Sequence, residues 1–185
     1  MKIIGFVYRE GEKTTGKGEK EGKWTMVLKG DSCLLNGRKP LFIPDWTKEL
    51  GMTPCLVLRV SRLGKEISER FAGRYYDAIA PGADFAALDL LRKAQEEGSS
   101  WTPSIGFDYS LALGEWMDVQ KDDVQSAKEW VMSPEEAIAE ASRWMTIRQG
   151  DLIYIQAQEA PRRVEKEEII RFAVNGEEKL YCKIK

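Results

Sequence analysis

The stretch that decides the fold, residues 56–72, reads LVLRVSRLGKEISERFA. Its first five residues, Leu56 to Val60, are apolar apart from one arginine, and such a run predicts a strand in the centre of a sheet. Downstream of Ser68 the pattern changes, because apolar residues now recur at helical spacing. This spacing predicts a helix over 68–79. The residues that carry it are Phe71, Ala72, Tyr75, Tyr76 and Ile79.

Two more helices follow towards the C-terminus. An apolar helical pattern opens at Asp84 and ends at Gly98, which predicts a helix over 84–97. The clearest signal is Ser133-Pro134-Glu135-Glu136, which offers an N-cap, a proline at the first helical position and a glutamate at the third. It predicts a helix over 134–145.

Short strands surround these helices. Asn-Gly pairs, which suit type I′ turns, predict hairpins at 33–43 and 169–184. Further strands are expected at 2–8, 24–28 and 152–155. Many short strands with three helices indicate an α+β, mostly β fold with helices on the outside. The chain shows no repeat or linker, so we expect one domain over residues 1–185.

Residues 9–23 contain no hydrophobic side chain, so we expect a mobile surface loop there. Within it, Gly11 to Gly18 resembles a phosphate-binding loop. The residue after Lys17 is glycine instead of the Ser or Thr that would hold Mg²⁺, and no helix pattern follows. The flexible-loop interpretation is therefore preferred.

Composition excludes several classes of function. The net charge is −2, from 28 basic and 30 acidic residues, so we expect no nucleic-acid partner. We also expect no membrane span and no signal peptide, and three widely spaced cysteines fit a cytoplasmic protein. The chain has no histidine, which excludes Ser-His-Asp and Cys-His catalysis within one chain and His-ligated metals.

A few residues are candidates for chemistry, each with a structural alternative. Asp84 is a helix N-cap or a metal ligand, and the residues alone favour the cap. Cys55 is a nucleophile or a small core residue, and the core is favoured. An aromatic and acidic cluster lies in a predicted loop, where it either serves a site or pins the loop. Its members are Trp101, Phe107, Asp108 and Tyr109.

Four segments together resemble the fumarylacetoacetate hydrolase-like family. Residues 59–72 resemble its central strand and the helix that follows, and residues 29–45 its early hairpin. Residues 84–90 resemble an Asp-x-Thr-Ala-Arg-Asp segment, and residues 132–153 the last helix and strand. The resemblance covers most of the chain in the family's order.

This resemblance implies a mixed β-sheet roll with peripheral helices, usually a homodimer. It also implies a carboxylate site for Mg²⁺ or Mn²⁺ that grips a small oxo-acid and stabilises an enolate. The family's ligands are a Glu-x-Glu in the central strand and the first Asp of the Asp-x-Thr-Ala-Arg-Asp segment. A lysine before a Phe-Asp pair assists, and a histidine on the N-terminal mobile segment often activates water.

The chain departs from this pattern at nearly every chemical position. The Glu-x-Glu falls on Thr53-Pro54-Cys55, and the lysine on Ile105, while the histidine has no counterpart. Asp84 survives as a weak metal candidate, and Phe107 and Asp108 remain as remnants of the pocket. The Thr and Arg of the Asp84 segment are replaced by Ala86 and Leu88. The resemblance thus predicts a kept framework with lost chemistry.

We therefore expect a non-catalytic protein, without a cofactor, that binds a small ligand, such as an oxo-acid, or a partner, such as an active paralogue. One alternative is a metal-dependent hydrolase, decarboxylase or isomerase of small oxo-acids with a site rebuilt from Asp84, Asp108, Tyr109 and a lysine. Another is a structural dimer without a ligand.

Overall fold

The computed structural model describes residues 1–9, 24–118 and 129–185. Within these residues, nine strands form one mixed sheet, and two more form a separate C-terminal ribbon. The sheet strands are β1 Ile3–Tyr8, β2 Trp24–Lys29, β3 Leu34–Asn36, β4 Leu50–Val60, β5 Tyr76–Ala87, β6 Leu111–Leu113, β7 Met117–Asp118, β8 Leu152–Gln156 and β9 Arg162–Arg163. The ribbon is β10 Ile169–Val174 with β11 Glu177–Lys183, and the helices are α1 Glu69–Ala72, α2 Leu88–Glu97, α3 Thr102–Ile105 and α4 Pro134–Trp144, with a 3₁₀ turn at Asp31–Cys33.

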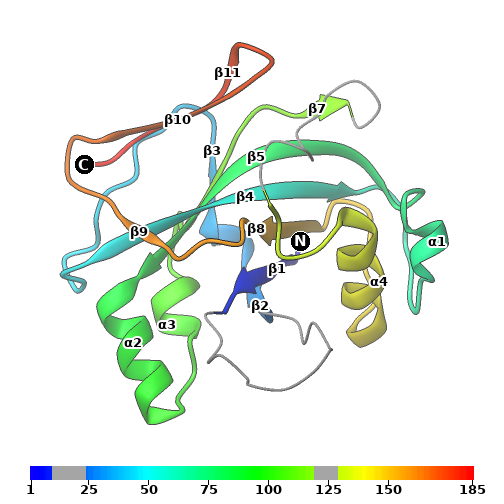
Figure 1. The fold of residues 1–185 in the computed structure, drawn as a ribbon, viewed down its shortest axis with the longest axis horizontal. Helices are drawn as coiled ribbons and strands as arrows, with labels where there is room; N and C mark the ends of the chain where they lie inside the picture. Colours follow the sequence, from blue (N-terminus) through cyan, green and yellow to red (C-terminus); the bar gives the residue numbers. More distant parts are fainter. Residues whose placement is uncertain (10–23, 119–128) are drawn as a thin grey trace.

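The main path of the sheet runs β2-β1-β8-β4-β5-β6-β3, with β7 paired to β5 and β9 paired to β4. The β1–β8 and β3–β6 pairs are parallel and the other pairs antiparallel, which confirms the mixed, mostly β fold. The long β4 and β5 strands curve across the molecule (Figure 1), with α2 and α3 together at one end and α1 and α4 at the other.

The centre of the sheet is apolar on both faces. Only Arg59 in β4 is not fully buried, and β5 is buried over nearly its whole length. Three clusters of buried side chains cover these strands, and they include Leu56 and Leu58 on one side and Met52 and Phe85 on another. A strand covered on both faces has no polar alternation, which is why the run at 56–60 is continuous.

Two local predictions are confirmed. Helix α4 begins as expected, because the Ser133 side chain accepts a hydrogen bond from the backbone of Glu136 and the Glu136 carboxylate accepts one from the backbone of Ser133. The β10–β11 hairpin turns at Asn175 and Gly176, whose φ angles are 52° and 82°.

The first two predicted helices are wrong in extent. Only Glu69–Ala72 of the helix expected over 68–79 is helical, because the chain enters β5 at Tyr76. The helix expected over 84–97 begins at Leu88, and Asp84 lies inside β5 instead of capping a helix. Residues 76–87 pair with β4 along their length, and this pairing outweighs a local apolar spacing that fitted a helix.

The hairpin predicted at 33–43 is also wrong. Strand β3 pairs in parallel with β6, and Leu41 bridges to Ile184 near the C-terminus. Gly37 has a positive φ of 72°, but Asn36 does not, so the turn is not the I′ type that a tight hairpin needs. The predicted loop 9–23 and the phosphate-loop pattern at 11–18 fall almost wholly outside the described residues.

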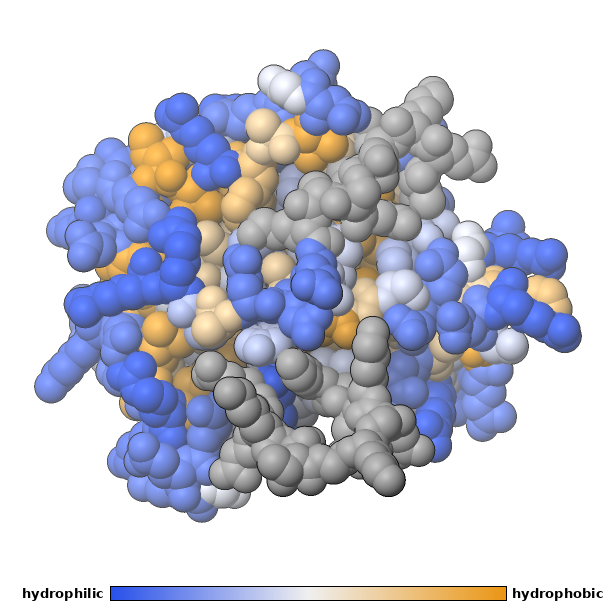
Figure 2. Space-filling view, viewed as in Figure 1, coloured by the Kyte–Doolittle hydropathy of each residue, from blue (hydrophilic) through white to orange (hydrophobic). Residues whose placement is uncertain are grey.

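The surface seen in Figure 2 is mostly hydrophilic, with hydrophobic residues gathered beside β10. Among the described helices, none is both long and apolar enough to cross a membrane.

Candidate functional site

The candidate site is built on the antiparallel pairing of β4 and β5. In this register Thr53 lies opposite Asp84, and Cys55 lies opposite Gly82. The side chains of Thr53, Cys55 and Asp84 are buried, since these residues are 2%, 1% and 4% exposed. The sheet thus brings together the positions that the resemblance assigned to metal ligands.

Asp84 forms a buried ion pair with Lys29, the last residue of β2. The Lys29 Nζ lies 2.6 Å from Asp84 Oδ1, and the side chains are 0% and 3% exposed. The same ammonium donates to the backbone oxygen of Ser110 at 3.0 Å and to its Oγ at 2.9 Å. An ammonium has three N–H donors, so these three partners satisfy it completely.

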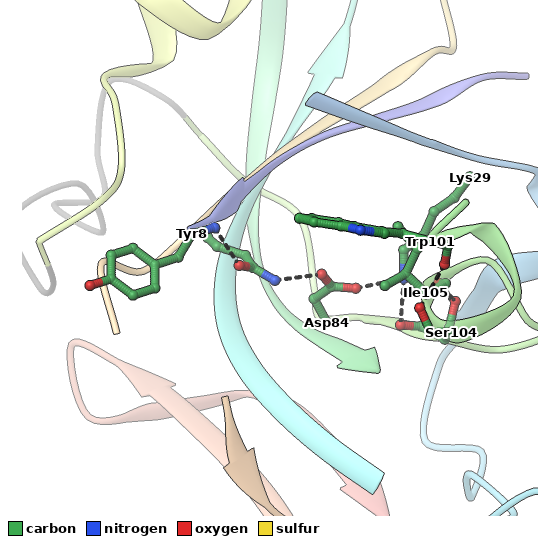
Figure 3. A network of polar contacts seen from close by, with 8 residues as sticks. Tyr8, Lys29, Asp84, Trp101, Ser104 and Ile105 are labelled. Atoms are coloured by element: carbon green, nitrogen blue, oxygen red, sulfur yellow. Dashed lines mark hydrogen bonds and ion pairs between the residues drawn. The ribbon is translucent and has the colours of Figure 1, made fainter. Parts of the chain in front are cut away.

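The second oxygen of Asp84 is held by Gln156, at the end of β8. Gln156 Nε2 donates to Asp84 Oδ2 at 2.7 Å, and Gln156 Oε1 accepts from the backbone N–H of Tyr8 at 2.7 Å. Figure 3 shows Asp84 between Lys29 and the strand that carries Tyr8, whose ring points away from the network. Side chains from β2, β5 and β8 therefore form one buried polar chain.

Two other buried groups lie beside this ion pair. Burial, together with the charge of Asp84, raises the pKa of the Cys55 thiol well above its usual value. Burial and the same charge raise the pKa of Tyr154 likewise. The Tyr154 hydroxyl finds no hydrogen-bond partner among the described residues. Its ring needs a glycine at position 5, because a Cβ there would lie 2.1 Å from Tyr154 Cζ.

A pocket of about 750 Å³ opens above these groups. Thr53, Asp84 and Gln156 form its floor, and α2 and α3 contribute walls. The apolar lining includes Ala86, Leu88, Leu91, Trp101 and Ile105. Exposed arginines stand among the lining residues, namely Arg9, Arg92 and Arg163. A pocket of this size accommodates a small organic molecule.

Comparison with known proteins identifies the framework. Residues 4–180 match the model of the fumarylacetoacetate (FAA) hydrolase C-terminal family. The chain belongs to this family. No curated protein sequence matches the chain.

Solved structures agree with this assignment at the level of the fold. A Burkholderia cenocepacia protein provisionally named a fumarylpyruvate hydrolase matches with a TM-score of 0.84 and 15% identity, over 100% of this chain and 88% of that one. The Pseudomonas aeruginosa fumarylpyruvate hydrolase, solved with Mn²⁺ and pyruvate, has a TM-score of 0.77 and 18% identity, covering 99% and 88%. A 5-carboxymethyl-2-hydroxymuconate delta-isomerase from Mycobacterium smegmatis gives 0.80 and 18%, covering 99% and 78%.

The residues present do not fit the metal that this family implies. Mg²⁺ and Mn²⁺ prefer several anionic oxygens. Here Thr53 offers a neutral hydroxyl, Cys55 a thiol whose pKa is raised, and both oxygens of Asp84 already accept hydrogen bonds. Within the described residues, no group of three or more Asp, Glu, Cys or His side chains is arranged to hold a metal ion.

The structure divides the sequence-predicted site residues into two groups. Asp84, Thr53 and Ile105 line the pocket, whereas Phe107 and Asp108 are not among its lining residues. Phe107 packs edge-on against Trp46 at 5.4 Å, and Asp108 is exposed. Tyr109, which adopts a positive φ of 63°, is 53% exposed. In this family member the chain leaves the pocket after α3, so these residues face away from it.

Two residues of the site were missed by sequence reasoning. In the sequence, Lys29 belongs only to the segment that resembles an early hairpin, and Gln156 follows the predicted strand 152–155 without an assigned role. Their signal was weak but present, since each is a polar residue at the end of an apolar strand, Trp24–Lys29 and Leu152–Gln156. A long polar side chain in that place is either exposed or paired with another buried polar group, and only the sheet order decides which.

Proposed function

We propose that this chain is a non-catalytic, metal-independent member of its family that binds a small ligand in the pocket above Asp84. The observation that carries the proposal is the Lys29–Asp84 ion pair. A buried lysine supplies the positive charge beside the one retained carboxylate, so a divalent cation would have to displace an ammonium with three satisfied donors.

Loss of the family's chemistry follows from the same residues. The enolate that the family stabilises needs a Lewis acid or another cation in contact with its oxygens. Lys29 does not line the pocket, and Ile105 stands where the resemblance places an assisting lysine. Asp84 is held between Lys29 and Gln156, so both of its oxygens are already engaged by donors of the protein itself.

The open pocket supports ligand binding over a purely structural role. The pocket has a volume of about 750 Å³. A structural dimer has no need of such a space, and filling it with larger side chains would add buried apolar area.

Two measurements test the proposal. The first is calorimetry with Mn²⁺, with and without oxalate, followed by assays on acetylpyruvate and oxaloacetate. We expect neither tight metal binding nor turnover. Micromolar Mn²⁺ binding together with metal-dependent turnover near about 1 s⁻¹, within the range of ordinary enzymes, would show a rebuilt catalytic site instead.

The second measurement is a thermal-shift screen of small organic acids, alcohols and amides in the presence of EDTA. Ligands should stabilise the wild-type protein but not Leu91→Trp, which places an indole in the pocket from α2. Leu63→Trp, at a position that is 69% exposed and outside the pocket lining, is the control. If no compound distinguishes the two variants, the ligand-binding proposal fails.

The homodimer and the cytoplasmic location remain predictions. Light scattering at tens of micromolar protein tests the first, and a monomer there would contradict it.

A further inference from the structure

The floor of the pocket carries no free positive charge. Each oxygen of Asp84 has a donor, and all three donors of Lys29 are used. Gln156 is also engaged at both ends, by Tyr8 and by Asp84. An anion that reached this floor would meet no free positive charge and would lose its own hydration without a cation to compensate it.

The walls above the floor include an apolar part. Leu88 and Leu91 of α2, Ala86 of β5, and Trp101 and Ile105 contribute it, alongside polar lining residues such as Gln95 and Ser99. Leu88 and Ile105 are 8% and 7% exposed, so they lie deep. Such walls favour a hydrocarbon or aromatic body, and the Trp101 indole offers a flat surface for stacking.

The rim is cationic. Arg9, Arg92 and Arg163 are all exposed lining residues, and the carboxylates among the described lining residues are those of Glu49 and Asp84. Lys29 neutralises Asp84, and Arg92 is hydrogen-bonded to Glu49. Neither Arg9 nor Arg163 forms an ion pair with any acidic residue in the described ranges 1–9, 24–118 and 129–185. The described residues at the mouth therefore carry a net positive charge, although the whole chain has a net charge of −2.

From this polarity we infer that the ligand is a small amphipathic anion bound with its head outward. Its apolar body lies between α2 and Trp101, and its single anionic group, a carboxylate or a phosphate, meets Arg163 and Arg9 at the rim. This inference rests on the proposed ligand-binding function and specifies its chemistry. The orientation is the reverse of that implied for oxo-acid enzymes of the family, in which the charged end enters first and meets the metal.

Matched probes test the class of ligand by calorimetry in EDTA. We expect 4-phenylbutanoate to bind about tenfold more tightly than 4-phenylbutanamide, which has nearly the same shape without the charge. Pyruvate and oxalate, which lack an apolar body, should bind more weakly than either. A 2-phenylethyl phosphate probe distinguishes the two head groups, and tighter binding than the carboxylate would identify phosphate at the same rim.

Three variants test the orientation. Arg163→Gln and Arg9→Gln should each weaken 4-phenylbutanoate about fivefold or more and leave the amide unchanged. Thr53→Val removes a hydroxyl from the floor and should weaken the anion less than either rim variant does. Arg74→Gln changes an exposed arginine outside the pocket lining and is the control for general loss of positive charge. The rim effect should also shrink at high salt.

The outcomes separate this inference from the proposed function. If Thr53→Val weakens the anion and the rim variants do not, the head points inward and the inference is wrong. If pyruvate or oxalate binds more tightly than the phenyl compounds, or if acid and amide bind equally, the inference fails while ligand binding stands. If no probe binds, the inference also fails, and the proposed function falls only if the thermal-shift screen is negative too.

Discussion

Two aspartates of this protein are equally buried, yet they are held in different ways. Asp84 and Asp151 are both 4% exposed, and each forms an ion pair with a lysine. The side chain of Lys29, the partner of Asp84, is 0% exposed, whereas that of Lys2, the partner of Asp151, is 35% exposed. The lysine is fully removed from water in one pair and hydrated in the other.

The two aspartates also differ in the other hydrogen bonds that they accept. Asp151 also accepts from the backbone N–H groups of Lys2, at 2.8 Å, and Arg148, at 2.9 Å. Asp84 accepts hydrogen bonds from the side chains of Lys29 and Gln156, which lie on other strands. Backbone donors remain when a partner side chain is replaced. Asp151 therefore keeps two hydrogen bonds when its lysine is substituted, whereas Asp84 keeps only the bond from Gln156.

The largest effect should come from Lys29→Met. The substitution keeps the apolar stem but leaves the Asp84 carboxylate buried with one donor, and breaking a buried pair in this way costs about 3–5 kcal/mol. Urea unfolding followed by tryptophan fluorescence measures the loss. A loss below about 1 kcal/mol, the usual range of an exposed pair, would mean that water reaches Asp84 and that the two aspartates do not differ as described.

A double-mutant cycle sharpens the same point. Asp84→Asn in the Lys29→Met background removes the unpaired charge while keeping an oxygen for Gln156. We expect the double variant to regain about 2 kcal/mol relative to Lys29→Met alone. Additive losses in the same unfolding assay would show that the two side chains are not coupled, and the replacement of a metal by Lys29 would lose its support.

The contrast between the two aspartates also explains what sequence could predict. The helix start at Ser133 and the hairpin turn at Asn175-Gly176 depend on residues within four positions of each other, and both predictions hold. The ion pair of Asp84 and Lys29 joins residues 55 positions apart in the sequence, on strands that are not neighbours in the sheet. No local pattern records that distance, and so Asp84 was read as a cap.

The resemblance to the family recovered part of what local patterns missed. It placed Asp84, Thr53 and Cys55 together, and the β4–β5 register brings them together. It could not supply Lys29 or Gln156 as partners, because no family motif assigned them a role. It also grouped Phe107 and Asp108 with the pocket, although the short helix α3 directs the chain away after Ile105. Backbone framework is easier to infer from a motif than the direction of its side chains.

A smaller effect is expected at Asp151, together with a pH dependence. Burial would raise the pKa of Asp151, but the hydrogen bonds from the Lys2 ammonium and from the backbones of Lys2 and Arg148 outweigh it and lower the pKa. Because the folded pKa is below the unfolded value of about 3.9, the stability that this carboxylate contributes is present at neutral pH and lost as the pH falls through the folded value.

Asp151→Asn should therefore lower the free energy of unfolding by about 2 kcal/mol at pH 7. The difference from the wild-type protein should shrink when unfolding is measured again near about pH 3, below the unfolded pKa. A difference that stays constant with pH would mean that the Asn variant disrupts packing instead of removing a charge. Glu97→Gln, at an exposed surface pair with Lys93 at 3.9 Å, is a control that should change little at either pH.

The smallest effect should be that of Lys2→Met, which removes the lysine of the Asp151 pair just as Lys29→Met removes the lysine of the Asp84 pair. The substitution removes one ammonium that is about a third exposed, and the backbone N–H of Lys2 still donates to Asp151. Solvent screening limits such a pair to about 0–1 kcal/mol, and raising the salt from about 0.05 to about 0.5 M should reduce even that, because the Debye length shortens and the exposed ammonium is screened more strongly. Lys29→Met should show no comparable salt dependence, since the side chains of its pair are only 0% and 3% exposed.

Urea unfolding of both variants at both salt concentrations gives four differences in the free energy of unfolding from the wild-type protein. Suppose that Lys2→Met lowers the free energy of unfolding as much as Lys29→Met does, and that neither loss depends on salt. Exposure of the lysine then does not determine the strength of these pairs, and the Lys29–Asp84 pair no longer supports the proposal that Lys29 replaces a metal ion.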